Sequence, residues 1–96
     1  MVTVTSLVQA IEGKEDELEK KLVAFSTKVK TEEGTVIYDL HRIRDTKGAF
    51  FFYEIFKDDV AFAHHNTTAH MQELAKQTVG LLAAEPILTH LEKISL

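Results

Sequence analysis

The stretch from residue 49 to residue 56 constrains the fold of this chain most, because it is apolar on both faces of an expected strand. It reads Ala-Phe-Phe-Phe-Tyr-Glu-Ile-Phe, and successive side chains of a strand point to opposite faces of the sheet. A strand with one exposed face normally alternates apolar and polar residues. Each large apolar side chain gains about 1.5–3 kcal/mol on burial. Both faces of this strand therefore need a cover.

The order of the expected elements supplies a cover for one of these faces. Runs of β-branched and apolar residues predict strands over residues 2–9, 35–44, 49–56 and 87–95. Helical spacing predicts helices over residues 14–30, 58–66 and 69–84. This order is that of the ferredoxin-like split βαβ fold, an α+β class with helices on one face of a four-stranded antiparallel sheet. A second copy of the chain is the simplest cover for the other face, so we expect a homodimer.

Length and composition narrow the class of protein. The 96 residues fit one domain, and we expect residues 1–96 to form it. The net charge of -4 argues against nucleic acid or an anionic membrane as a partner. The chain has no cysteine, which excludes disulfides and thiolate chemistry and suits a reducing compartment. With no recognisable signal peptide or membrane-spanning apolar stretch, the expected location is cytoplasmic.

Glu54 is the only charged residue within the aromatic strand, and it is the first candidate for chemistry. A buried carboxylate without a partner is costly, so it should be paired or have a raised pKa. One interpretation is a structural acid paired with Arg42, Arg44 or a histidine. The other is a general base, or the residue that orients one. The residues alone leave both open.

The expected hairpin gives this strand a rough register. A four-residue loop over 45–48 places His41 opposite Phe52, so Glu54 lies diagonally from His41 on the same face. The same register places Asp39 opposite Glu54, where two like charges are unfavourable. Either the register is shifted by one residue, which would move every side chain to the other face, or two acids share a site.

A second constellation spans residues 65–70, His-Asn-Thr-Thr-Ala-His. On one continuous helix His65 and His70 would point about 140° apart, given 3.6 residues per turn. They converge only if the helix breaks between them. Thr67 and Thr68 offer such a break, because a Thr68 hydroxyl can cap the helix that follows. The alternative is a capped helix junction with two surface histidines.

No motif of a cofactor site is present. The chain lacks HExxH, and His64 and His65 are adjacent and point apart, which makes a zinc site a poor interpretation. It also lacks a GxGxxG loop, a Walker loop and a GxSxG elbow. We therefore expect no metal, flavin, haem or nucleotide cofactor.

Several of these features together resemble the antibiotic biosynthesis monooxygenase domain family, also called the dimeric α/β barrel. The resemblance spans nearly the whole chain. It rests on Glu33-Gly34, the strand with Tyr38, the run from Phe52 to Phe56, and residues 65–70, which resemble the family signature H-x-x-[S/T]-x-H. Two positions depart from the family pattern: Ala69 replaces a frequent proline, and Phe56 replaces a frequent tryptophan.

The resemblance implies a ferredoxin-like monomer whose sheet packs against that of a second copy, with a cavity between the sheet and the helices. Family members include cofactor-free oxygenases of quinols and polyketide aromatics, haem-degrading enzymes and an isomerase of the phosphorylated autoinducer-2 signal. The haem-degrading branch uses a tryptophan, which this chain lacks. A phosphorylated substrate favours Lys or Arg at its pocket, and residues 65–70 contain neither.

The leading hypothesis is thus a cofactor-independent monooxygenase acting on a quinol-like or polyphenolic small molecule. His65 or His70 would be the base, and Glu54 would orient a histidine or hold its charge. The residues expected to bind the substrate are Tyr38, His41, Asn66 and Thr68. The alternatives are an isomerase or other proton-transfer enzyme on a small enolisable substrate, and a non-catalytic dimer that binds a small ligand.

Overall fold

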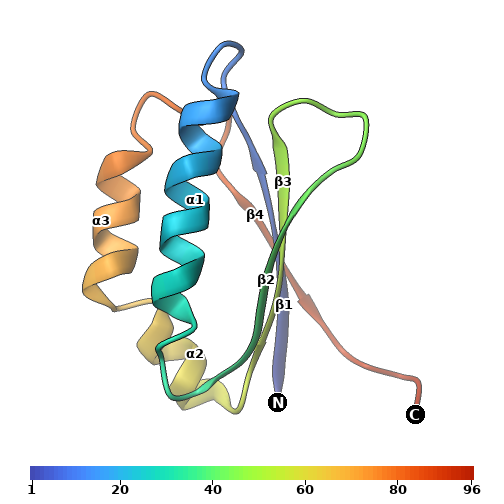
Figure 1. The fold of residues 1–96 in the computed structure, drawn as a ribbon. Coiled ribbons are helices and arrows are strands. Elements are labelled where there is room, and N and C mark those ends of the chain that lie inside the picture. The colour runs from blue at the N-terminus through green and yellow to red at the C-terminus, as the bar shows by residue number, and fades with distance from the viewer.

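The computed structural model describes residues 1–96 and has the expected ferredoxin-like α+β architecture. Its strands are β1 (Val2–Gln9), β2 (Thr35–Arg42), β3 (Ala49–Phe56) and β4 (Ile87–Leu91). Its helices are α1 (Glu15–Val29), α2 (Asp59–His65) and α3 (Ala69–Gln77). The antiparallel sheet has the order β2-β3-β1-β4, and all three helices lie on one side of it (Figure 1).

The core lies between α1 and the helix-facing side of the sheet. Four residues of α1 spaced by four, three and four positions are buried: Leu18, Leu22, Phe25 and Val29. They form one cluster with the helix-facing aromatic residues of the strands, which are Tyr38, Phe50, Phe52 and Phe56. The helical spacing seen in the sequence therefore marks the face of α1 that covers the sheet.

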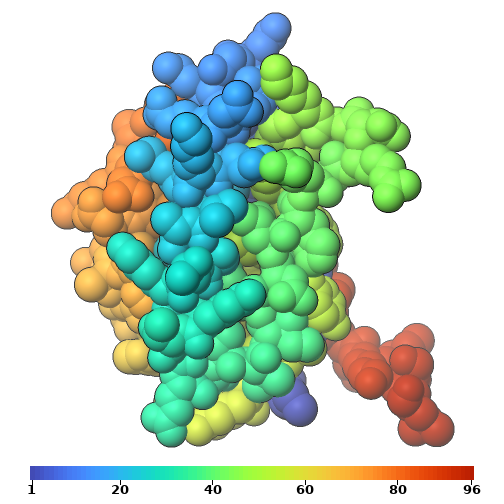
Figure 2. Space-filling model, in the orientation of Figure 1, coloured from blue at the N-terminus to red at the C-terminus, as the bar shows by residue number.

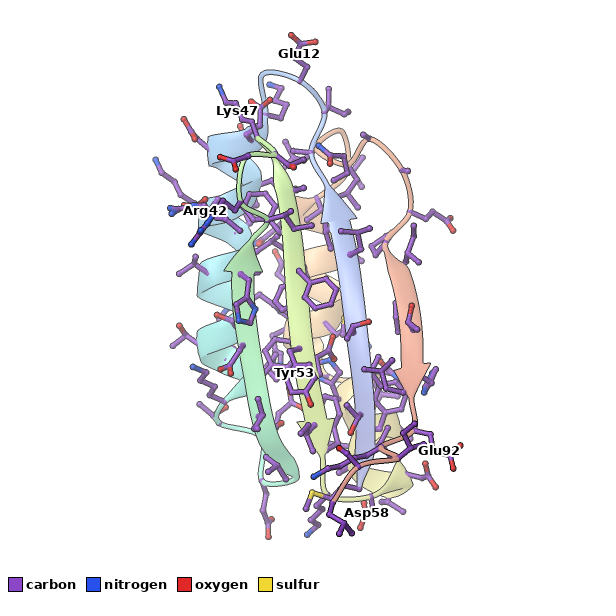
Figure 3. All side chains as sticks on the ribbon, turned by 90° about the vertical axis from the view of Figure 1, so that its right-hand side faces the viewer. Glu12, Arg42, Lys47, Tyr53, Asp58 and Glu92 are labelled. Atoms are coloured by element: carbon purple, nitrogen blue, oxygen red, sulfur yellow. The ribbon has the colours of Figure 1, made fainter.

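The other face of the sheet has no helix over it. Phe51, Tyr53 and Ile55 of β3 point to this side and are only partly buried within the chain. Figure 3 looks onto this open face and shows Tyr53 near its centre. Of the two apolar faces of β3, one is thus covered by the helices and belongs to the core, and the other is uncovered.

The register of the β2–β3 hairpin differs from the expected one by a single residue. Tyr38, not Asp39, lies opposite Glu54, and His41 lies opposite Phe51. The cause is a longer turn: the N–H of Ile43 donates to the carbonyl of Ala49, so residues 44–48 form the loop. The expectation that His41 shares a face with Glu54 was therefore wrong.

Two C-terminal elements are shorter than expected. Helix α3 ends at Gln77, not at residue 84, because the chain turns through Gly80 at φ 80° and Leu82 then bridges to Ala10. Strand β4 ends at Leu91, not at residue 95. The last residues stand off from the body of the molecule (Figure 2). None of the helices is long and apolar enough to cross a membrane.

Gly34 gives a test of how the turn before β2 packs on α2. A β-carbon built on Gly34 would overlap the side chain and approach the backbone of Ala61, and the Gly34 carbonyl accepts from the N–H of Lys57. We expect Gly34→Ala to lower the free energy of unfolding by about 1–3 kcal/mol, because the helix must shift to make room. Chemical denaturation measures this loss.

The matched control is Ala61→Gly, which removes the opposing β-carbon. Alone it should cost about 1 kcal/mol through helix propensity. The double variant should lose less than the sum of the two single variants, because the overlap is relieved. Strict additivity would contradict the proposed contact.

Candidate functional site

A cavity of about 120 Å³ lies between the helix-facing side of the sheet and the helices. Most of its walls are apolar. Its polar side chains come from strands, from helices and from the turns that follow them: Ser6, Tyr38, Glu54, His65, Asn66 and Thr78. No lysine or arginine lines it. The cavity is therefore suited to a small, largely apolar molecule that carries groups able to form hydrogen bonds.

His65 is the last residue of α2 and is 2% exposed. Its ring lies among aromatic neighbours, with ring centroids 4.9 Å from Phe56 and 5.5 Å from Tyr38. Its Nδ1 lies 3.2 Å from each carboxylate oxygen of Glu32. Burial lowers the pKa of His65, while the hydrogen bond to Glu32 opposes that effect. The neutral ring is therefore the favoured form at pH 7.

Glu32 joins His65 to His70. It lies in the turn after α1, its side chain is 6% exposed, and its Oε2 is 2.6 Å from Nε2 of His70. The turn holds its backbone, since the Glu32 N–H donates to Val29 and the Glu32 carbonyl accepts from Thr35. One buried carboxylate thus takes a hydrogen bond from each of two histidines on different helices.

The helix break that this arrangement needs occurs at Thr68. The Thr68 hydroxyl accepts from the N–H of Met71 at 3.2 Å and donates to the carbonyl of His65 at 3.1 Å. This cap starts α3 in a new direction and lets His65 and His70 meet at Glu32. Thr68 does not line the cavity, so the structure gives it a capping position in place of the expected substrate contact.

Glu54 projects from β3 into the same cavity as His65. It is 4% exposed and its carboxyl makes none of the side-chain hydrogen bonds in the structure. Arg42, one of its expected partners, pairs with Glu19 on α1 at 2.5 Å. Burial raises the pKa of Glu54 to about 7. Glu54 is therefore able to hold or release a proton near neutral pH.

Tyr38 and Asn66 also line the cavity. Tyr38 lies directly across the β2–β3 ladder from Glu54 and is 4% exposed. Burial raises its pKa above the ordinary tyrosine value, and the charges of Glu54 and Glu32 add to the rise. The phenol therefore keeps its proton and serves as a hydrogen-bond donor. Asn66, which caps the end of α2, is exposed at the edge of the cavity.

The remaining two expected residues lie outside the cavity. His41 is exposed on the uncovered face of the sheet, where its Nδ1 is 3.2 Å from the carbonyl of Phe51. The register shift explains this position. His70 is behind His65, with a side chain 20% exposed, and it opens onto a separate cleft between α1 and α3. Of the three residues expected to be catalytic, His65 and Glu54 share one cavity, and His70 reaches it only through Glu32.

A larger cleft of about 460 Å³ lies at the opposite end of the sheet, between the start of α1 and the β2–β3 loop. Its walls are mainly exposed charged side chains such as Asp16, Arg44 and Lys47. It contains no buried titratable group, so it has no residue prepared for proton transfer. No group of three or more His, Asp or Glu side chains anywhere in the chain is arranged to hold a metal ion.

Sequence reasoning missed Glu32 and Ser6. Ser6 lies on β1, on the helix-facing side, and is 8% exposed. The alternation of β1 places it on that side, but its small size gave no signal. Glu32 follows α1 in a polar turn that resembles ordinary surface. The only available indication was that a buried histidine needs a polar partner, which narrows the search to acids without choosing among them.

Comparison with known proteins identifies relatives of this chain. The family model described as antibiotic biosynthesis monooxygenase matches residues 1–77. No curated protein matches the chain.

Solved structures share the fold over nearly the full length. The Pseudomonas aeruginosa protein PA3566 has 26% identity and a TM-score of 0.92, with 98% of this chain and 94% of that chain covered. An antibiotic biosynthesis monooxygenase has 19% identity and a TM-score of 0.91, with 99% and 100% covered. Rv0793 from Mycobacterium tuberculosis has 23% identity and a TM-score of 0.89, with 99% and 96% covered. The last two likenesses establish the fold alone.

The buried carboxyl of Glu54 predicts a distinct dependence of stability on pH. Its pKa is about 7 in the folded chain, against the ordinary glutamate value of 4.5. The folded state therefore binds the proton more tightly, and this contribution is full below about pH 4.5 and is lost as pH rises through 7. We expect Glu54→Gln to become more stable relative to wild type by up to about 3 kcal/mol between pH 5 and 9.

Denaturant unfolding of both proteins across this pH range measures the difference. Glu19→Gln is the matched control, because Glu19 is on the surface and paired with Arg42. A difference between wild type and Glu54→Gln that does not change with pH would contradict the raised pKa of Glu54.

Proposed function

The chain belongs to the antibiotic biosynthesis monooxygenase family, and from that premise we propose that it is a cofactor-independent monooxygenase of small quinol-like or polyphenolic molecules. One observation carries the proposal. His65, oriented by the carboxylate of Glu32, faces the same small cavity as the unpaired carboxyl of Glu54. The cavity thus combines a base, a second group that exchanges protons near pH 7, and mostly apolar walls.

His65 is the proposed general base. In the neutral ring, Nδ1–H donates to Glu32, which leaves the lone pair on Nε2. Nε2 makes none of the hydrogen bonds in the structure, and the ring lines the cavity. Glu32 also stabilises the imidazolium that forms when His65 takes a proton, in the way that an acid supports the histidine of a catalytic triad.

The reaction needs no external reductant, because the substrate supplies the electrons. His65 removes a phenolic proton at Nε2, and the electron-rich phenolate reduces molecular oxygen. One oxygen atom becomes bonded to the ring and the other leaves as water. The four electrons come from the substrate, which ends as a hydroxylated quinone. The protein contributes proton removal, placement of the anion and exclusion of bulk water.

Glu54 and Tyr38 are the proposed contacts to the substrate oxygens. Because the pKa of Glu54 is about 7, its carboxyl is protonated in part of the molecules and can then donate a hydrogen bond. Tyr38 lies across from it and remains a donor. Asn66, at the edge of the cavity, is the proposed contact to a second oxygen of the substrate.

Size and charge limit the substrate. A cavity of about 120 Å³ is comparable to the apolar cavities of roughly 150 Å³ that hold one benzene ring. Its lining has one carboxyl group, that of Glu54, and one imidazole, that of His65, but no lysine or arginine. This lining disfavours phosphorylated or anionic molecules. A single neutral hydroxylated ring fits these limits best.

A second candidate is an isomerase of a neutral enolisable substrate. The observation that favours it is the pairing of two proton-exchanging groups, His65 and Glu54, on one cavity. Such a pair can remove a proton at one carbon and return it at another without oxygen. Oxygen consumption separates the two reactions, and tight binding without turnover would identify a non-catalytic ligand-binding protein.

The proposal includes a homodimer formed by two uncovered sheet faces, with residues 1–96 acting as one domain in the cytoplasm. Phe51, Tyr53 and Ile55 stand on this face with Leu7 and Ile37 of the neighbouring strands. A contiguous apolar surface of this kind normally marks an interface. The absence of cysteine suits the proposed compartment.

Activity tests the role of His65. We expect His65→Gln to lower the kcat of oxygen uptake with a panel of one-ring hydroquinones by about 10²–10⁴-fold, because the base is lost. His64→Gln, the exposed neighbour, is the matched control and should retain wild-type turnover. Equal turnover of His65→Gln and wild type would overturn the assignment of the base.

Mutation of the uncovered face tests the homodimer. Wild type should sediment as a dimer at micromolar concentration. Tyr53→Glu places a charge at the centre of that face and should shift the protein toward monomer, because the carboxylate must be desolvated in the interface. Asp59→Lys on the helix side is the control and should remain dimeric. A wild-type protein that sediments as a stable monomer would overturn this part of the proposal.

A further inference from the structure

An inner cavity and an outer cleft lie on opposite sides of a layer of apolar side chains, which forms a wall between them. The inner cavity holds His65 and Glu54, and the outer cleft of about 70 Å³ holds His70. Phe25 and Leu74 line both of them and therefore form the wall. Phe25 lies against both imidazoles, with ring centroids 6.1 Å from His65 and 5.7 Å from His70. The wall is apolar where these side chains meet.

The carboxylate of Glu32 crosses this wall. It is within hydrogen-bond distance of Nδ1 of His65, at 3.2 Å, and of Nε2 of His70, at 2.6 Å. Its side chain is 6% exposed, so water has little access to it, whereas that of His70 is 20% exposed and reaches solvent through the outer cleft. The three residues thus form a polar connection between the substrate cavity and solvent on the other side of the helical layer.

We propose that Glu32 and His70 are positioning residues that couple proton uptake at His65 to proton release at the outer cleft. When His65 takes a proton from the substrate, His70 releases one to solvent. The inference deepens the proposed function and rests on it for the source of the first proton. It gives His70 a role distinct from that of a base, since His70 never touches the substrate.

The coupling keeps the net charge of the buried group His65, Glu32 and His70 at zero during the reaction. With His70 protonated and His65 neutral, the carboxylate of Glu32 balances one imidazolium and the group is neutral. When His65 gains the substrate proton at Nε2, the group would carry one net positive charge in a buried place. Release of the Nδ1 proton of His70 into the cleft restores neutrality, and Nε2–H remains on Glu32. When His65 later returns its proton, His70 takes one from water. No electron moves in this exchange.

Other charged groups surround the two histidines and enter any test of pH dependence. His65 faces Glu32, His64, His70, Tyr38 and Glu54. His70 faces Glu32 and, across the outer cleft, Lys21, Lys28 and Glu73. Among these charged groups, Glu32 alone is within hydrogen-bond distance of both rings.

Nuclear magnetic resonance tests the coupling without requiring activity. We expect the pKa of the His65 ring to rise in His70→Gln, which keeps an N–H donor for Glu32 and removes the positive charge. It should fall in Glu32→Gln, which removes the carboxylate. His64→Gln is the matched control, since it removes a nearby imidazole that does not contact Glu32, and it should shift His65 less than His70→Gln does. Identical His65 titrations in wild type and His70→Gln would overturn the proposal.

Kinetics provides the second arm with the same one-ring hydroquinones and oxygen uptake. His70→Ala should lower kcat by about 10–100-fold with little change in KM, in the range found for residues that support a catalytic group. Added imidazole, which fits the space vacated beside the outer cleft, should restore part of the loss. A lower kcat with a raised KM, and no rescue by imidazole, would show a merely structural role. If wild type turns over no hydroquinone, the proposed function fails, and the titrations still decide whether Glu32 couples the two histidines.

Discussion

The structure depends on β3, which has large apolar side chains on both faces of the sheet. Its even-numbered aromatic residues form the core under α1, and its odd-numbered residues form the uncovered side of the sheet. Glu54 occupies a core position among phenylalanines, where a carboxyl is unfavourable unless something compensates for its burial. Nothing in the chain pairs with it. The unfavourable burial of Glu54 thus falls at the cavity that it shares with His65.

Two buried carboxyls with opposite surroundings define the site. Glu32 accepts hydrogen bonds from two imidazoles, so its charge is compensated inside the protein. Glu54 makes no such bond, and burial raises its pKa to about 7. The same chemical group therefore holds two imidazoles in one place and serves as a proton donor or acceptor in another. Different environments that separate the behaviour of two acids are a frequent feature of sites that exchange protons.

The sequence predicted the fold well because strong local patterns specify it. The spacing of Leu18, Leu22 and Phe25 identified α1, and the Thr68 cap was predicted together with the break that it creates. Register was less predictable, since one additional residue in the 44–48 turn moves His41 to the opposite face. The end of α3 was also missed, because the positive φ of Gly80 interrupts a pattern that otherwise continues.

The site itself was predictable only in part, and the reason is physical. Glu54 could be identified because a charged residue within an aromatic strand is unusual, and His65 because its spacing to His70 resembles a family signature. Glu32 could not, because an acid in a polar turn is unremarkable until the fold brings it to a buried histidine 33 residues further along the chain.

The break at Thr68 is the step that turns these separate residues into a site. A continuous helix would keep its backbone hydrogen bonds and direct His65 and His70 about 140° apart. The capped break exchanges some of those bonds for the Thr68 contacts and for the two histidine bonds to Glu32. Hydrogen bonds to a charged group contribute about 1.5–3 kcal/mol each, which is enough to offset the loss of a helical bond worth about 1 kcal/mol. The geometry that the chemistry requires is therefore also one that the folded chain favours.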